Sequence, residues 1–350
     1  MKHLLVIRNS AMGDVALTLP AVKAALTTYP NLKITFVSHR QFAPFFAGLE
    51  RLTYVSADYK SENRGFWGIL KLARHLMKMG PFDAVLDLHS VIRSWLLTSH
   101  FSVLGIPVFR IDKGRKDKKA LTRKEFKIFK RLKPSYERYS DVFKKAGYPI
   151  LLGNGPWIRE KEFPLAFFSD KSLLPKNKTW IGFAPFARHE GKKWPEDKSE
   201  QLIKELADNG NIVFLFGGGL EEKIRLDEIA DQNLNVHSIA EKFSLSQELA
   251  LMQKVDLMVT MDSSNLHMAS LVGTPVISIW GPTHSHTGFE PLGPNNNLKV
   301  EIDPSVLTCR PCSVFGNKPC FRGDYACLNW IEVSDVKDKI KKVIEGAKYS

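Results

Sequence analysis

The strongest constraint on the fold of this chain is a regular alternation of short apolar segments with amphipathic segments of helical spacing, present in both halves. Such an alternation predicts an α/β architecture, in which crossover helices connect the strands of a parallel sheet. In the first half we expect strands at residues 4–7, 34–37, 84–88 and 108–111, and helices at residues 16–28 and 67–79.

The alternation stops at residues 163–177, which lack clear periodicity and carry Pro164 and Pro175, and it then begins again. We therefore expect a linker there, between doubly wound domains at residues 1–165 and 176–333, and a final helix within residues 334–350. Two such domains would leave a cleft between them, and ligands of such sheets bind beyond the carboxyl ends of the strands. The second domain is expected to have strands at 180–183, 212–216, 256–260 and 276–280, and helices at 195–207, 220–231, 246–255 and 265–271.

The chain of 350 residues has a formal net charge of +13. This excess is concentrated in residues 113–133, which hold eleven Lys or Arg and only two acids, Asp117 and Glu125. A local excess of this kind favours polyanionic partners: nucleic acid, nucleotides, a phosphorylated glycolipid or an anionic membrane surface. Because no apolar run could span a bilayer and the start of the chain is too short for a signal-peptide core, we expect a cytoplasmic protein.

The segment RNSAMGDVALTLPAV, residues 8–22, connects an expected strand to an expected helix. Gly13 can adopt the positive φ of a tight turn and lets a ligand approach the backbone. Asp14 then stands at or near the helix N-cap, where it is either a capping group or a general base for an acceptor hydroxyl. The second interpretation meets an objection, since a helix N-terminus makes a carboxylate less basic.

A second segment, APFARHEGKKWPED at residues 184–197, follows the first expected strand of the second domain. Arg188, Lys192 and Lys193 lie in a loop that leads into a helix N-terminus, which is a suitable site for phosphate. Pro195 suits the first turn of that helix. Alternatively, the two adjacent lysines are simply solvated.

A run of three glycines in FGGGLEE, residues 216–222, also follows an expected strand and opens an expected helix. Gly217 and Gly218 fit close approach of a nucleotide to the backbone, with Glu221 or Glu222 near enough to meet a ribose hydroxyl. By itself this signal is weak, since the run lacks the spaced G-x-G-x-x-G of a dinucleotide site.

The third segment is TMDSSNLHMASLVGTPVISIWGPT, residues 260–283. Asp262, Ser263 and Ser264 end a strand and open a helix, so their hydroxyls and amides either face the cleft or serve only as helix caps. His267 lies one turn into that helix, as a ligand or as a half-buried helix residue. Three such loops, each at the carboxyl end of a strand, together indicate an anion site.

All four cysteines lie late in the chain, at Cys309, Cys312, Cys320 and Cys327. Cys309-x-x-Cys312 has the spacing of a zinc ligand pair, whereas the second pair is spaced more widely than in common zinc ribbons. The cluster is therefore either a zinc site or a set of free thiols, and a disulfide is not expected in a reducing cytosol.

These segments, with KKWPE and the late CRPC…C…C tail, resemble the bacterial ADP-heptose:lipopolysaccharide heptosyltransferase family, glycosyltransferase family nine, from end to end of the chain. The resemblance implies a GT-B fold, two Rossmann-like domains facing across a cleft, with the acceptor on the first domain and the nucleotide sugar on the second. It implies no catalytic metal and no cofactor, with Asp14 as general base and Lys192 holding the donor diphosphate. In this chain Ser263 and Ser264 replace a Thr-Gly pair of the family, and the acid that the family carries after the glycine-bearing strand has no clean counterpart.

We therefore expect an inverting glycosyl transfer, in which Asp14 takes the acceptor proton and Lys192, with Arg188, stabilises the departing nucleoside diphosphate. The expected partners are an ADP-sugar or another nucleotide sugar, an acidic lipid-linked acceptor such as the lipopolysaccharide core, and the anionic inner-membrane surface, which the basic segment would bind. The expected donor-binding residues are Ala184, Arg188, Lys192, Gly217, Gly218, Glu221, Asp262, Ser263, Ser264 and His267, and the expected acceptor-binding residues are Arg8, Ser10, Met12, Gly13, Arg93, Arg115, Lys119 and Arg123.

The sequence alone leaves two other functions open. A nucleic-acid-binding protein would use the basic segment, but the chain has no RRM, KH or helix-turn-helix signature, so we expect no specific nucleic-acid partner. A Rossmann oxidoreductase is disfavoured because the dinucleotide fingerprint is missing.

Overall fold

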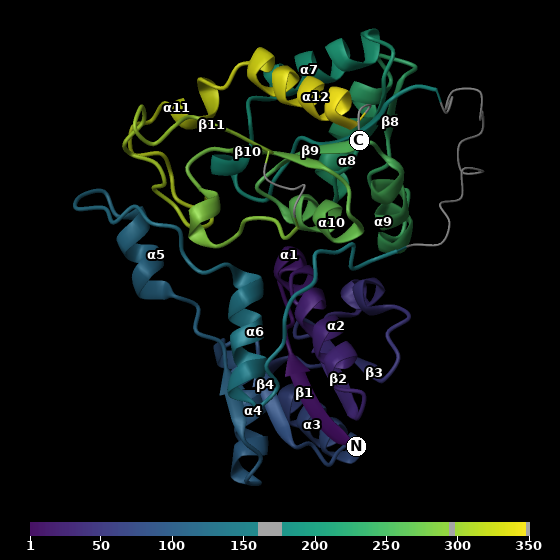
Figure 1. The fold of residues 1–350 in the computed structure, drawn as a ribbon, viewed down its shortest axis with the longest axis vertical. Coiled ribbons are helices and arrows are strands. Elements are labelled where there is room, and N and C mark those ends of the chain that lie inside the picture. Colours follow the sequence, from purple (N-terminus) through teal and green to yellow (C-terminus); the bar gives the residue numbers. More distant parts are fainter. Residues whose placement is uncertain (160–176, 294–297, 348–350) are drawn as a thin grey trace. The chain divides into compact units, whose positions relative to one another are not determined.

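The computed structural model describes residues 1–159, 177–293 and 298–347, which form two compact units. The N-terminal unit comprises Met1–Lys113 and Lys133–Gly153, and the C-terminal unit comprises Gly114–Leu132 and Asn154–Ser350. Each unit contains one parallel sheet, as predicted (Figure 1). The expected linker, apart from residue 177, and the expected boundary between residues 165 and 176 lie outside the described residues. In the part of the chain that is described, no helix is long and apolar enough to cross a membrane.

The N-terminal unit is built on a five-stranded parallel sheet with the order β3-β2-β1-β4-β5. Since the chain runs outward from β1 in one direction and later returns to add β4 on its other side, β1 and β4 form the topological switch point, where sheets of this type bind ligands. The strands are β1 (Lys2–Ile7), β2 (Leu32–Ser38), β3 (Leu52–Ser56), β4 (Ala84–Asp87) and β5 (Val108–Arg110).

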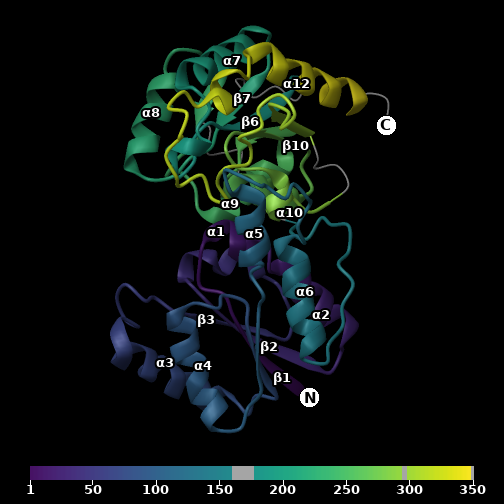
Figure 2. The ribbon, with the colours of Figure 1, turned by 90° about the vertical axis from the view of Figure 1, so that its left-hand side faces the viewer.

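Helices cover both faces of this sheet (Figure 2). The helix α3 buries Ile69, Leu72, Ala73 and Leu76, which are spaced to line one side of a helix, against the sheet. It packs beside α4 on that face, while α2 and α6 pack together on the other. The helices of this unit are α1 (Met12–Ala16), α2 (Leu19–Thr28), α3 (Gly65–Met79), α4 (Ile92–Val103) and α6 (Ser135–Lys145).

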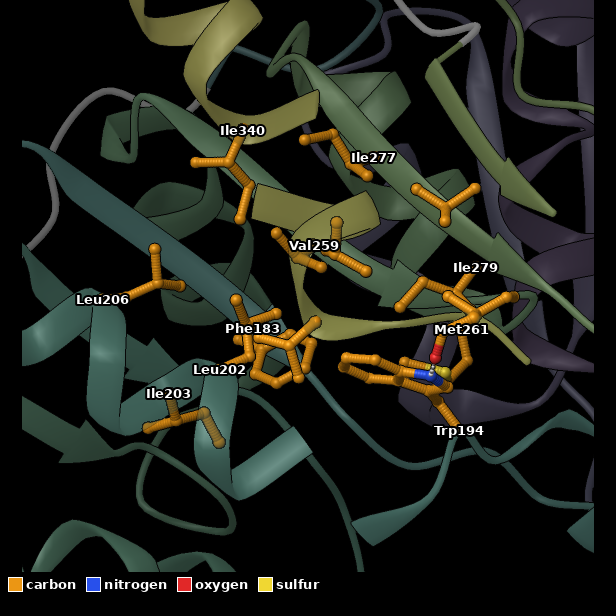
Figure 3. Close-up of a cluster of buried hydrophobic side chains, with 14 of the residues drawn as sticks. Phe183, Trp194, Leu202, Ile203, Leu206, Val259, Met261, Ile277, Ile279 and Ile340 are labelled. Carbon is orange, nitrogen blue, oxygen red and sulfur yellow. Dashed lines mark hydrogen bonds between the residues drawn. The ribbon is translucent and has the colours of Figure 1, made fainter. Parts of the chain in front are cut away.

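The C-terminal unit has a six-stranded parallel sheet with the order β11-β10-β9-β6-β7-β8, whose switch point lies between β6 and β9. Helices α7, α8 and α12 share one core with this sheet. Figure 3 shows part of this cluster, with Leu202 and Leu206 of α7, Ile340 of α12, and Val259 and Ile277 of the strands. The elements are β6 (Trp180–Ala184), β7 (Ile212–Leu215), β8 (Val236–Ser238), β9 (Leu257–Met261), β10 (Val276–Trp280), β11 (Leu298–Glu301), α5 (Arg115–Thr122), α7 (Glu196–Asp208), α8 (Leu220–Ala230), α9 (Leu245–Lys254), α10 (Ser264–Val272), α11 (Ala326–Asn329) and α12 (Val333–Ala347).

The predicted strands are confirmed within one or two residues, but three strands were not predicted. These are β3, β8 and β11, which occupy sheet edges or are only three or four residues long and are less buried than the central strands. A short or half-exposed strand lacks the continuous apolar run by which the buried strands are detected. The helix expected at residues 16–28 is two helices, α1 and α2.

The basic segment differs most from the sequence expectation, which places it in the first domain. Residues Gly114–Leu132 pack with the C-terminal unit. Lys127 Nζ donates a hydrogen bond to the carbonyl oxygen of Cys309 at 2.8 Å, and Lys118 Nζ lies 4.3 Å from the ring centre of Phe289. These contacts with residues far along the chain attach the segment to the C-terminal unit, and they cannot be deduced from its composition.

Candidate active site

The switch point of the N-terminal unit places Arg8, directly after β1, against Asp14 in α1. Arg8 Nη2 lies 2.5 Å from Asp14 Oδ2, and Arg8 Nη1 donates to the carbonyl oxygen of Leu88 at 2.8 Å. The Arg8 side chain is only 8% exposed, whereas that of Asp14 is 28% exposed. Arg8 therefore holds a carboxylate that solvent, and hence a substrate, can reach.

Asp14 does not cap its helix. The N-cap of α1 is Ala11, without a side-chain cap, and Asp14 is the third residue of the helix. The capping interpretation is therefore wrong, and the carboxylate is committed to Arg8 instead. Gly13 lies within α1 and is not among the glycines with positive φ, so the expected positive-φ turn is not found there.

Helix α6 completes the support of this pair. The guanidinium carbon of Arg8 lies 5.9 Å from the ring centre of Tyr139, and Tyr139 Oη donates to the Asp14 carbonyl oxygen at 3.3 Å. Arg8 is thus buried and contacts Asp14, Leu88 and Tyr139, and it positions Asp14.

His89 is a residue of this site that the sequence reading missed. It follows β4 at the same switch point, and burial, with the positive charges of Arg8, Lys113 and Arg93, lowers the pKa of His89 to about 3. The imidazole is thus neutral at physiological pH and can exchange hydrogen bonds without adding charge. The only signal in the sequence was its place directly after an expected strand.

The other expected acceptor-binding residues are divided between the units. Ser10 is exposed, while Met12 and Gly13 are half-buried beside Asp14 in the chain, and Arg93 is exposed on α4. Arg115, Lys119 and Arg123, by contrast, lie on or directly after α5 and belong to the C-terminal unit.

The switch point of the C-terminal unit joins two of the predicted motifs. Lys192, in the loop after β6, places its Nζ 2.7 Å from Oδ2 of Asp262, which directly follows β9. Their side chains are 15% and 5% exposed. An ammonium group held at the edge of solvent by a buried carboxylate is suited to receive an anionic ligand, because the carboxylate fixes its position.

The N-terminus of α10 lies at the same place in the sheet. Ser263 is its N-cap and accepts a hydrogen bond from the Asn265 amide at 3.3 Å, and its hydroxyl lies 3.1 Å from that of Thr260. Ser264 is the first helical residue, and His267 is buried one turn further on. Ser263 thus acts as a cap and still leaves the helix N-terminus, with its partial positive charge, beside Asp262.

The glycine run is arranged differently from the prediction. The Gly218 amide donates to Glu222 at 2.9 Å, and the Gly219 amide donates to Glu241 at 2.7 Å. A carboxylate therefore occupies the Gly218 amide, one of the two that were expected to approach a nucleotide. Glu222, one of the two acids expected near the ribose, is the acid that binds it. Of the other expected donor residues, Ala184 is buried at the end of β6 and Arg188 is exposed in the following loop.

The cysteine-bearing loop contributes a structural arginine that the sequence reading overlooked. Arg310 is fully buried. It donates to the carbonyl oxygens of Gly281, at 2.6 Å, and of Trp280 and Thr283, and its guanidinium lies 2.9 Å from Glu301. It thereby ties this loop to the ends of β10 and β11, next to β9 and Asp262.

The four cysteines are free thiols, and burial raises the pKa of Cys327 to about 12. Over residues 1–159, 177–293 and 298–347, no group of three or more His, Cys, Asp or Glu side chains is arranged to hold a metal ion.

Comparisons with known proteins agree with this arrangement. A sequence profile of glycosyltransferase family 9 (heptosyltransferase) matches residues 69–312. Lipopolysaccharide heptosyltransferase 1 of Escherichia coli K12 is 24% identical over 295 residues, which cover 80% of this chain and 88% of that one.

Two solved structures share the fold. A glycosyltransferase of family 9 from Veillonella parvula superposes with a TM-score of 0.73 at 18% identity, covering 99% of this chain and 98% of that chain. E. coli heptosyltransferase WaaC with ADP superposes with a TM-score of 0.69 at 21% identity, covering 97% and 99%. The fold is therefore GT-B, as expected, and the chain belongs to glycosyltransferase family 9, the heptosyltransferase family.

Proposed function

We propose that this protein transfers heptose, with inversion at the anomeric carbon, from ADP-heptose to a lipopolysaccharide core acceptor. The observation that carries the proposal is that each unit has an ion pair at its switch point. Arg8 pairs with Asp14 in one unit, and Lys192 pairs with Asp262 in the other. The names of the relatives, a lipopolysaccharide heptosyltransferase and a heptosyltransferase solved with ADP, support the choice of sugar and nucleotide.

The C-terminal unit supplies the leaving-group chemistry. As the bond from the anomeric carbon to the diphosphate oxygen breaks, negative charge grows on the departing ADP. Lys192 Nζ, fixed by Asp262, and the amides at the start of α10 are placed to stabilise that charge. In this proposal they do the work that a metal ion does in other transferases, so transfer proceeds without a divalent cation.

The N-terminal unit supplies the base. Asp14 accepts the proton of the acceptor hydroxyl while the hydroxyl oxygen attacks the anomeric carbon from the face opposite the leaving group, which inverts the configuration. The Arg8 ion pair holds the carboxylate in place for this transfer. In this proposal the proton moves late, when the bond to ADP is largely broken.

The nature of the acceptor bears on where the protein works. A lipid-linked core saccharide carries phosphate and carboxylate groups at the membrane surface, which suits a basic protein. We therefore place the proposed reaction at the cytoplasmic face of the inner membrane.

The test combines nucleotide binding with turnover. Thermal-shift titrations against ADP, UDP and GDP are run on the wild type, Lys192→Ala and Asp14→Asn, followed by transfer assays with ADP-heptose and a core acceptor, with and without EDTA. We expect stabilisation by ADP that Lys192→Ala loses and Asp14→Asn keeps. Both variants should lose about 10²–10³ in kcat/KM, the usual effect of removing one such group.

Other outcomes would change the proposal in defined ways. Preference for UDP or GDP would retain the glycosyltransferase and reject ADP-heptose as donor. Inhibition by EDTA that Mg²⁺ reverses would reject metal-independent transfer. Full activity of Asp14→Asn would remove Asp14 as the base, and absence of any nucleotide-induced shift would reject the donor site itself.

A further inference from the structure

The outer surface of the helix pair α3 and α4 carries apolar side chains that the proposed reaction does not use. In α4, Ile92 and Val103 are 81% and 86% exposed, and Trp95 is 47% exposed. Together with Ser99 these positions recur every three or four residues, so they lie on one side of the helix. The Ser99 hydroxyl donates to the Leu96 carbonyl oxygen of its own helix, which leaves this stripe apolar along its length.

The neighbouring helix adds aromatic and basic groups to the same layer. At the start of α3, Phe66 and Trp67 are 52% and 74% exposed, and their rings pack edge to face with centres 5.4 Å apart. Further along, Lys71, Arg74 and Lys78 are exposed at intervals of three and four residues. Because α3 and α4 pack side by side on one face of the sheet, their solvent sides point away from that sheet together (Figure 2). We call this surface the α3–α4 face.

The charge of the α3–α4 face has one sign. Neither α3 nor α4 contains an Asp or Glu, whereas α7, for comparison, carries five in thirteen residues. In the part of the chain that is described, Lys71, Arg74 and Lys78 form no ion pair. A soluble helix surface normally mixes both signs, so a basic stripe beside exposed Trp, Phe and Ile is typical of a surface that meets anionic lipid.

The basic segment Gly114–Leu132 is the other surface that could bind an anionic membrane, but fewer of its cations are available to do so. Several of its cations are committed within the C-terminal unit: Lys127 to backbone carbonyls, Arg131 to Glu290 and Lys118 to the ring of Phe289. A charge that is already paired gains less from a second anion, so net charge alone overstates the attraction of this segment for a membrane.

We infer that the protein docks on anionic bilayers through the α3–α4 face, with Trp67, Ile92 and Trp95 entering the headgroup region and the α3 cations contacting lipid phosphates. The first residues of α3 and α4 follow the carboxyl ends of β3 and β4, the sheet edge that also carries Asp14. Docking there would bring the acceptor end of the N-terminal unit to the lipid. This use of the docking rests on the proposed function, whereas the docking itself does not.

The experiment is sedimentation with vesicles of phosphatidylethanolamine and phosphatidylglycerol, compared with vesicles of phosphatidylcholine alone, in the absence of any sugar. We expect binding to the anionic vesicles that weakens with added salt. The double variant Trp67→Ser/Ile92→Ser should bind about tenfold or more weakly, since two apolar anchors are lost. Leu151→Ser/Leu234→Ser, which removes two exposed leucines elsewhere, is the matched control and should bind like the wild type.

Charge reversals separate the two candidate surfaces. Lys71→Glu/Arg74→Glu should weaken binding several-fold, and Lys116→Glu/Lys119→Glu in α5 should change it much less. The inference is overturned if the α5 variant alone abolishes binding, or if the wild type does not bind anionic vesicles. It is also overturned if the α3–α4 variants change only self-association on gel filtration without lipid. ADP-induced thermal shifts of all variants report on the donor site separately, so failure of docking and failure of the proposed function are distinguishable.

Discussion

Gly316 lies directly against the side chain of Lys192. Its φ is +70°, and a Cβ built on it would stand 2.5 Å from Lys192 Cγ. The glycine is thus required twice, for its backbone conformation and for the space that the lysine stem fills. Through this contact the cysteine-bearing loop limits where the Lys192 side chain, and with it the ammonium group of the proposed donor site, can lie.

We expect Gly316→Ala to displace Lys192 and to weaken ADP binding about tenfold, measured by isothermal titration. Gly323→Ala is the matched control, because Gly323 lies in the same loop with a φ of +83° but has open space where its Cβ would be. Both variants should lose roughly 1 kcal/mol of stability through backbone strain. Equal ADP affinity in the two would refute a role for the Gly316 contact.

The Arg8–Asp14 ion pair predicts a defect in catalysis without a defect in donor binding. Arg8→Met should reduce kcat about a hundredfold, since loss of positioning by about 1 Å has effects of that order. The affinity for ADP, measured by isothermal titration, should stay that of the wild type, because Lys192 and Asp262 belong to the other unit. Arg8→Lys should restore part of kcat. A weakened affinity for ADP, or no recovery of kcat in Arg8→Lys, would contradict this positioning role.

We expect the replacement of Arg310 to lower the stability of the protein strongly. Replacing Arg310 with Met removes the donors to several carbonyl oxygens of buried residues and one of the ion-pair partners of Glu301, so we expect a loss of about 3–5 kcal/mol. The melting temperature of the Arg310→Met protein should fall by several degrees. Arg322→Met, which breaks an exposed pair with Asp324, should cost no more than about 1 kcal/mol. Similar melting temperatures for the two variants would contradict the assignment.

Glu248 in α9 predicts a pH-dependent stability. Burial and the nearby charge of Glu241 raise the pKa of Glu248 to about 8, from an ordinary value of 4.5. Between these two values the folded protein holds a proton that the unfolded chain releases. Its contribution to stability is therefore complete below pH 4.5 and is lost as the pH rises through 8.

It follows that Glu248→Gln, which keeps the shape and cannot ionise, should melt several degrees above the wild type at pH 9. At pH 4.5 the two proteins should melt at nearly the same temperature. The exposed substitution Glu137→Gln provides the control. A constant difference between wild type and Glu248→Gln across this pH range would rule out titration of Glu248 as its cause.

Much of the fold was predictable because its signals are local. Each buried central strand carries its own apolar run, and α3 repeats its buried residues at helical spacing, so the α/β class and most elements follow from short windows of sequence. The motif residues Lys192 and Asp262 were also predictable. Asp262 directly follows such a strand, and Lys192 lies in the loop after another. What no local window contains is the order of the strands.

Only the tertiary structure decided which segments meet. The sheet order makes neighbours of β1 and β4, and of β6 and β9, and so pairs Lys192 with Asp262 and places His89 beside Arg8. The same long-range packing attaches the basic segment to the C-terminal unit. It also buries Arg310, whose hydrogen bonds tie the cysteine-bearing loop to the end of β10. The sequence determined the helices and strands, and the polar residues that follow the strands, because these depend on residues close together in the chain. Partners distant in the chain depend on how the sheets assemble, and burial then decides whether a charged side chain binds a substrate or holds another residue in place.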